Sequence, residues 1–371
     1  MTNMLEFLED AFQPLSRRYE QYKSVKGFIG NNEKCLDLIY LFLDLGRDDK
    51  SILNKSNFNR ASHIIITFLL GLGIEKRQKI IAGVNIFNSL PDEYLWMFTS
   101  LLHDYGYFRN ELLVSKPFED LKLEYDLLTD TYSESEIKCL NNYSIRFPKH
   151  CTFSYQTIKN YYAYKREFIT THGIDENGEA NDHGIMGACL AFSQYIQHYV
   201  KYEYPRIMWN GTDRDNWLIT EPLLYKTACL VAAQHNLFKS ESQESDLKYM
   251  EYNLTSLLST APVQINESNP LLLLLSIVDT VECSKRFSKK TNPKKYLQTM
   301  TIIKNIDIEV NTDSILVDFT NLNEYILKNK KDNDVLIKQL ESHVRNITYL
   351  NQWTTYHGEK CGDYAVIIRR K

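Results

Sequence analysis

The chain has 371 residues, 43% of them apolar and 24% charged, which is the composition of a globular protein with a sizeable core rather than a disordered or fibrous chain. Its formal net charge of -4 excludes a global positive field that would hold a nucleic-acid polymer or an anionic membrane. We therefore expect a small molecule as the partner.

Residues 1–54 are predicted to form an N-terminal helical extension. The start of this segment mixes apolar and charged residues and lacks the basic region and apolar run of a signal peptide. The seven cysteines of the chain are scattered singly, without a Cys-x-x-Cys pair, which indicates reduced thiols and a cytoplasmic location. The longest apolar run, Leu271 to Val278, is too short to span a bilayer and ends at Asp279.

Helical periodicity dominates the first 300 or so residues. Apolar residues recur three and four positions apart in six segments, which are Cys35 to Leu45, Ala61 to Leu72, Tyr94 to Leu102, Gly184 to Val200, Pro222 to Ala233 and Pro270 to Lys285. We therefore predict a mainly α fold whose catalytic domain covers residues 55–303. A section around residues 110–180 that is rich in Tyr, Phe and Lys is predicted to be an insertion in this domain.

The periodicity changes near residue 304. The stretch IDIEVNTDSILVDF alternates polar and apolar residues around an Asn-Thr-Asp turn, which is typical of a β-hairpin. Helical spacing returns from Val335 to Leu350, and AVIIRR near the end is predicted to be a closing strand. Residues 304–371 are therefore expected to form a small α+β appendage.

The segment LLHDYGYF carries the most informative chemistry. A mostly apolar helix ending near Tyr105 delivers the adjacent His103 and Asp104 just before Gly106. Both side chains can reach one cation if the helix end turns toward it, and imidazole with carboxylate suits Fe, Mn, Zn or Co rather than Ca or Mg alone. A His-Asp pair also occurs at ordinary capped helix ends, so a metal site here depends on companion residues.

Four further polar residues accompany apolar helical segments. His63 lies at the start of one predicted helix and His183 beside the start of another. His235 ends a helix of small residues, and Asp279 lies within a very apolar one. Each of these groups would destabilise the fold if it were buried without a partner, and a shared cation would satisfy all of them.

This order of residues resembles the HD superfamily of metal-dependent phosphohydrolases. The resemblance covers roughly residues 55–290, and the stretch IVDTVECSKRF is similar to the last motif of the superfamily. The fold that it implies is an all-α helical bundle with the metals between its central helices. By position, His63, His103, Asp104 and Asp279 match the four minimal metal ligands, and His183 and His235 match the extra histidines of members that hold two metals.

The resemblance implies a catalytic role for Asp104, His183 and His235 at a site with two divalent transition-metal ions. Asp104 would bridge the ions, and a metal-bound hydroxide would attack a phosphate ester or anhydride of a small, nucleotide-like substrate. Arg60, Lys285 and Arg286 lie near ligands in the sequence and are the candidates for pairing with substrate phosphate. Many hydrolytic members of the superfamily carry a lysine shortly after the His-Asp pair. In this chain, the first basic residue after the pair is Arg109.

Two other functions fit the same residues. Four histidines and two aspartates also match the ligands of di-iron oxygenases that share this fold, such as myo-inositol oxygenase. A sensor or interaction protein could use the metals for structure alone and the α+β appendage for contact. The sequence indicates neither the oligomeric state nor which of the four metals binds.

Overall fold

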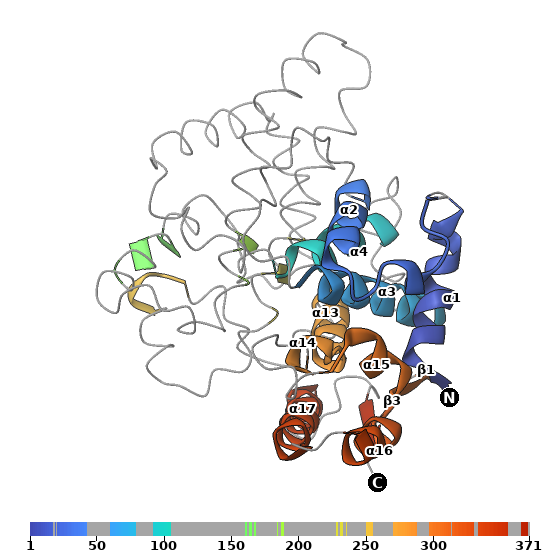
Figure 1. Cartoon of the computed structure of the whole chain (residues 1–371). Helices are drawn as coiled ribbons and strands as arrows, with labels where there is room; N and C mark the ends of the chain where they lie inside the picture. The colour runs from blue at the N-terminus through green and yellow to red at the C-terminus, as the bar shows by residue number, and fades with distance from the viewer. Residues whose placement is uncertain are drawn as a thin grey trace. The chain divides into compact units, whose positions relative to one another are not determined.

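The described residues are mainly α-helical and include a small four-stranded sheet, as the sequence predicts (Figure 1). The computed structural model describes residues 1–17, 19, 21–42, 60–78, 92–104, 250–254, 270–287, 297–312, 314–329, 333–354 and 365–369, together with single positions at 160, 161, 163, 164, 167, 184, 187, 188, 228, 231, 232 and 235. None of the helices among these residues combines the length and the apolar character needed to cross a membrane.

The chain divides into two compact units. The first unit consists of Met1–Lys50, Lys55–Val84 and Ala261–Lys371, and the second of Ser51–Asn54 and Asn85–Thr260. The sequence-based division into an extension, a catalytic domain and an appendage stays a prediction.

Helix α3 (Ala61–Gln78) is the central helix of the first unit. Its residues from Ala61 to Leu70 are all buried, so this helix is covered on every side. It packs against α1 (Met4–Ser16), α2 (Asn32–Phe42) and α13 (Pro270–Val281). Helix α13 is buried from Leu271 to Thr280, which explains its almost purely apolar sequence.

The sheet joins the two ends of the chain in the first unit. Its strands are β1 (Thr2–Asn3), β2 (Asp307–Val310), β3 (Ser314–Asp318) and β4 (Ala365–Arg369), in that spatial order. The pair β2–β3 is antiparallel, which confirms the predicted hairpin, and β4 is parallel to β3. The pairing of β1 with β2 brings the N-terminus to the sheet, and Figure 1 shows it there.

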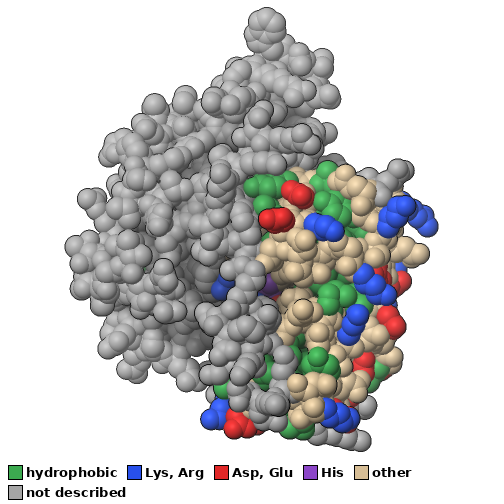
Figure 2. Space-filling model, viewed as in Figure 1, with side chains coloured by type: hydrophobic (Ala, Val, Ile, Leu, Met, Phe, Trp, Pro, Cys, Tyr) green, Lys and Arg blue, Asp and Glu red, His purple; other side chains and the backbone are tan. Residues whose placement is uncertain are grey.

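Three more helices complete the C-terminal part of the first unit. These are α15 (Thr299–Lys304), α16 (Thr320–Asn329) and α17 (Asn333–Thr354). Helix α17 confirms the helical prediction for Val335 to Leu350, and it packs against α13, α16 and β4. On the face shown in Figure 2, acidic and basic side chains of the described residues are interspersed.

The predicted helix Pro270 to Lys285 is divided in two. Helix α13 ends at Val281, and the four-residue α14 (Ser284–Phe287) begins after Glu282 and Cys283. A carboxylate oxygen of Glu282 accepts a hydrogen bond from the Ser284 amide at 2.7 Å. This contact satisfies a backbone donor at the start of α14, so the side chain of Glu282 stabilises the break.

In the second unit, the longest described element is α4 (Asp92–Leu102), which matches the helix predicted over Tyr94 to Leu102. Positions 184, 187, 188, 228, 231 and 232 are helical and buried. They belong to the predicted helices Gly184 to Val200 and Pro222 to Ala233, most of which lie outside the described residues.

The short η1 (Val25–Gly27) belongs to the first unit.

Candidate metal centre

His63 lies in the first turn of α3, where the sequence places it, and its side chain is buried. The start of the helix is fixed by Asn32, whose side-chain oxygen accepts a hydrogen bond from the Ser62 amide at 3.1 Å. Nδ1 of His63 forms a short hydrogen bond with the carboxylate of Glu282, which is also buried. The ring of His63 is therefore held directly by Glu282, and the start of its helix is anchored at the neighbouring Ser62.

The carboxyl group of Glu282 is ionised. Burial alone would raise its pKa, but His63, the Ser284 amide and the Lys285 ammonium together hold this pKa below its ordinary value. A carboxylate can only accept hydrogen bonds, so Nδ1 of His63 carries the proton of their shared bond. The ring then directs Nε2, the other nitrogen, toward Asp279.

Asp279 lies in α13, and its Oδ1 is 3.2 Å from Nε2 of His63. The ammonium of Lys285 in α14 lies close to both atoms, 2.8 Å from Asp279 Oδ1 and 3.1 Å from His63 Nε2. Asp279 is 8% exposed and the Lys285 side chain 22%. The first unit thus gathers an imidazole, two carboxylates and one ammonium in a nearly buried cluster.

In the second unit, His103 and Asp104 directly follow α4, and both are fully buried. The His103 amide continues the helical hydrogen bonding by donating to the Thr99 carbonyl at 3.1 Å. The Nδ1 atom of His103 donates to the carbonyl of Ser100 at 2.5 Å. Nε2 of the same ring lies 3.6 Å from Asp104 Oδ1, so the pair presents its ligand atoms together.

His235 joins this pair from a distant part of the sequence. Its ring meets that of His103 edge to face, with centroids 5.3 Å apart. Its Nδ1 donates to the Ala232 carbonyl at 2.5 Å. Ligand atoms of His103, Asp104 and His235 all lie within 4.8 Å of one another, and all three residues are buried. These groups could hold a metal ion.

Gly184 packs directly against the segment that carries His235. A Cβ atom at Gly184 would lie 2.3 Å from the Ala232 carbonyl oxygen and 2.9 Å from Nδ1 of His235. Because only glycine allows this approach, the residue that follows His183 in the sequence can lie against the His235 ring. His183 itself lies outside the described residues.

The three described histidines of the predicted ligand set share one arrangement. Each donates from Nδ1 to a fixed oxygen, which is the Glu282 carboxylate for His63 and a backbone carbonyl for His103 and His235. An oxygen of this kind only accepts, so Nδ1 carries a proton and Nε2 is the nitrogen left to bind a metal. Metal-bound histidines in proteins are held in this way.

The distance between His63 and Asp279 also fits a metal ion. Nitrogen and carboxylate ligands lie about 2.1 Å from an ion such as Zn²⁺. The two atoms are 3.2 Å apart, which is less than twice this ligand distance, so both could bind one ion without rearrangement of the backbone.

The predicted ligands therefore fall into two described groups. His63 and Asp279 meet in the first unit, and His103, Asp104 and His235 meet in the second. The assignment of both groups to one centre stays a prediction.

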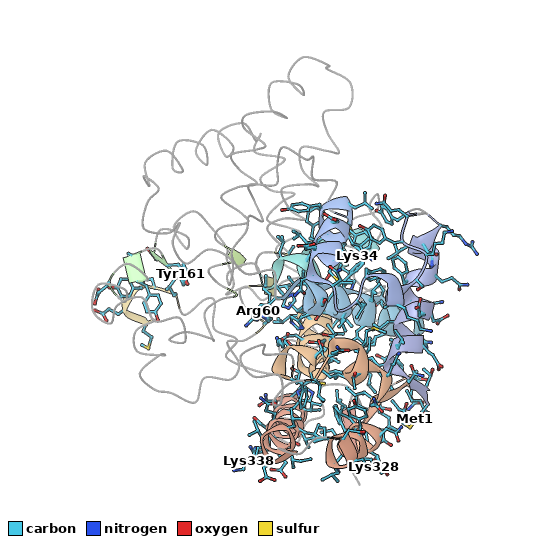
Figure 3. The ribbon with its side chains drawn as sticks, in the orientation of Figure 1. Met1, Lys34, Arg60, Tyr161, Lys328 and Lys338 are labelled. Carbon is cyan, nitrogen blue, oxygen red and sulfur yellow. The ribbon has the colours of Figure 1, made fainter. Side chains whose placement is uncertain are left out.

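The three basic candidates for phosphate binding differ in their surroundings. Lys285 contacts the ligand candidates themselves. Arg60 directly precedes α3 and is partly exposed (Figure 3). Arg286 lies within α14, but its side chain is outside the described residues.

Two further residues of the site were not among the predicted site residues. From the sequence, Glu282 could be either a proton carrier or an ion-pair partner of Arg286, and Gly184 is only the residue that follows His183. The spacing of Glu282 from Asp279 was the available signal, because residues three apart share a helix face. No local pattern indicates that Gly184 approaches Ala232.

Comparison of the chain with protein-family models, with curated proteins and with solved structures finds no match.

Proposed function

We propose that the protein is a metal-dependent phosphohydrolase that resembles the HD superfamily. One observation carries the proposal: the buried residues His103, Asp104 and His235 bring their ligand atoms within 4.8 Å of one another. These are residues that the resemblance assigns to the metal site, and they come from separate parts of the sequence. Burial of such polar groups costs free energy unless they share a partner such as a cation.

The proposed ligands are His63, His103, Asp104, His183, His235 and Asp279. Their nitrogen and oxygen donors suit a divalent transition metal, which we propose to be Fe, Mn, Co or Zn, with two ions per chain. The fixed Nδ1 atoms of the described histidines support this assignment. The assignment of both groups of ligands to one metal centre, with Asp104 as the bridging ligand, is supported by the resemblance alone.

Bound divalent ions supply Lewis acidity, which lowers the pKa of water and neutralises charge on phosphoryl oxygens. Hydrolysis forms a bond from the water oxygen to phosphorus and breaks the bond from phosphorus to the leaving oxygen, which takes up a proton. The contribution of the chain is to hold its imidazole and carboxylate groups in fixed orientations before substrate arrives.

The proposed substrate is a small phosphorylated molecule of the nucleotide type. An anionic substrate needs basic partners, and Arg60, Lys285 and Arg286 are the candidates. The net charge of the chain is only -4, so we expect a few local contacts between basic side chains and the substrate rather than a broad basic surface.

The first test is the metal content of the purified protein by elemental analysis. We expect about two ions per chain, and the loss of bound metal in His103→Ala and Asp104→Ala. His343→Ala is the matched control, because His343 is also a buried histidine but is not one of the proposed ligands, and its ring packs against Phe319 in the first unit. The metal found is then used in a screen of phosphate esters and nucleotides.

The outcomes separate the candidate functions. Phosphate release that depends on the metal and on Asp104 supports the proposal. Oxygen consumption by an iron-loaded protein, without phosphate release, would replace hydrolysis by oxygenation. Bound metal that stabilises the fold without turnover would leave a metal-stabilised sensor, and the absence of any bound or restorable transition metal would refute all three.

A further inference from the structure

Lys285 contacts the two side chains of the first unit, His63 and Asp279, that are proposed to bind a metal. Its ammonium is 3.1 Å from His63 Nε2 and 2.8 Å from Asp279 Oδ1, the two atoms of the first unit that are proposed to bind a metal. The contact with Asp279 is a hydrogen bond that Lys285 donates. Lys285 thus brings a positive charge to both of the proposed ligand atoms.

The position of Nε2 makes this arrangement exclusive. Nδ1 of His63 is hydrogen-bonded to the Glu282 carboxylate, so Nε2 is the ring nitrogen that faces both Asp279 and Lys285. A metal bound at Nε2 would occupy the side of the ring that the Lys285 ammonium now contacts. Binding of a metal to His63 therefore requires this contact with Lys285 to break.

Electrostatic repulsion acts in the same direction. An ion about 2.1 Å from both His63 Nε2 and Asp279 Oδ1 would lie no more than about 4 Å from the Lys285 nitrogen, given the separations of these three atoms. Two cations at this distance, in a cluster that is almost buried, repel each other more strongly than they would in water. The ammonium must move away as the ion binds.

We propose that Lys285 is a built-in competitor of the metal, which holds His63 and Asp279 together in the metal-free protein and is displaced when an ion takes their ligand atoms. This inference rests on the proposed metal site. It gives Lys285 a role that differs from substrate binding, since Lys285 acts before any substrate arrives. Helix α14, which is short and begins after the break at Glu282, is the element that carries the displaced residue.

The test compares metal affinity in the full chain and in Lys285→Met, which keeps an apolar side chain of similar length without the charge. We expect Lys285→Met to bind Mn²⁺ or Zn²⁺ at least about tenfold more tightly, the size expected for the loss of one charged hydrogen bond. Lys285→Arg keeps the positive charge, so its metal affinity should remain close to that of the unmodified protein. Lys328→Met is the control, because Lys328 is 71% exposed on α16, well away from Arg60 and the start of α3 (Figure 3).

A second measurement detects the displacement directly. Acylation of lysines, followed by mass spectrometry, should modify Lys285 faster in the metal-loaded protein than in the metal-free protein, while Lys328 reacts equally in both. Unchanged affinity in Lys285→Met together with unchanged labelling would overturn this inference and leave the metal site intact. Failure of both the unmodified protein and Lys285→Met to bind any transition metal would overturn the proposed function as well.

Discussion

Glu282 lies 219 positions after His63 in the sequence, and its carboxylate accepts a hydrogen bond from Nδ1 of His63 inside the first unit. The second oxygen of the same carboxylate accepts the amide of Ser284. One side chain therefore sets the orientation of a proposed ligand and the start of α14. A change at Glu282 should therefore affect both the His63 ring and the start of α14.

We predict that Glu282→Leu destabilises the protein by about 2 kcal/mol or more, because it leaves the His63 ring and the Ser284 amide buried without their acceptor. Metal affinity should fall by about 10- to 100-fold, as expected when the group that orients a ligand is lost. Chemical unfolding and metal titration measure the two effects. Glu282→Gln, which retains one acceptor oxygen, should recover part of both.

The matched control is Glu324→Leu, since Glu324 is exposed on α16 and pairs with Lys328 at the surface. This pair should contribute little to stability. If Glu282→Leu and Glu324→Leu changed metal affinity equally, Glu282 would have no role in orienting His63.

Local patterns in the sequence predicted much of this arrangement. The alternation in IDIEVNTDSILVDF predicted the β2–β3 hairpin, and apolar spacing predicted α3, α4 and α17. The placement of His63 at the start of α3 and of the His103-Asp104 pair at the end of α4 followed from the same spacing. These features depend on residues within a few positions of one another.

Features that depend on distant contacts were not predictable in this way. The pairing of Thr2 with Ile308 involves a two-residue strand, which is too short to show any period. The end of α13 at Val281 interrupts a continuous helical pattern, because the side chain of Glu282 binds the Ser284 amide. Only the folded chain brings such groups together.

Gly184→Ala should disrupt the second unit. Its new Cβ would lie 2.3 Å from the carbonyl oxygen of Ala232, which also accepts the hydrogen bond from His235. Backbone must move to relieve such a contact, so we expect a loss of about 1–3 kcal/mol of stability and weaker metal binding through the displaced His235. Gly27→Ala is the control, because a Cβ there meets no atom within 4 Å. Equal stability of the two variants would show that the contact at Gly184 is tolerated.

Removal of metal should lower the thermal stability of the protein. Without an ion, the buried Asp104 carboxylate loses a counter-charge that favours the folded state. A ligand at 100 times its Kd stabilises a protein by about 3 kcal/mol, so chelation should lower Tm by several degrees. Thermal unfolding with a chelator, and again after addition of Mn²⁺, Fe²⁺, Co²⁺ or Zn²⁺, measures the effect. An identical Tm under all these conditions would contradict a metal site in the folded protein.

The Cys35 thiol provides a prediction at alkaline pH that is independent of the metal site. Burial raises the pKa of Cys35 from 9.0 to about 12, although hydrogen bonding with Ser62 and the Gly30 backbone opposes part of this rise. Sγ lies 3.3 Å from the Phe28 carbonyl oxygen and 3.4 Å from the Ser62 hydroxyl. The folded protein therefore keeps the neutral thiol at a pH where the unfolded chain has already ionised.

The direction of the pH effect follows from this order of ionisation. Below pH 9 both states hold the proton, and the contribution of Cys35 to stability is complete. Between pH 9 and 12 the unfolded state loses its proton first, so this contribution declines by about 1 kcal/mol per pH unit. Comparing the unmodified protein with Cys35→Ala cancels the titration of tyrosines and lysines that both share. The difference between the two proteins in the free energy of unfolding should be constant from pH 7 to 8 and should shrink by roughly 1 kcal/mol at pH 10. A constant difference over the whole range would mean that the folded protein exposes the thiol to ionisation.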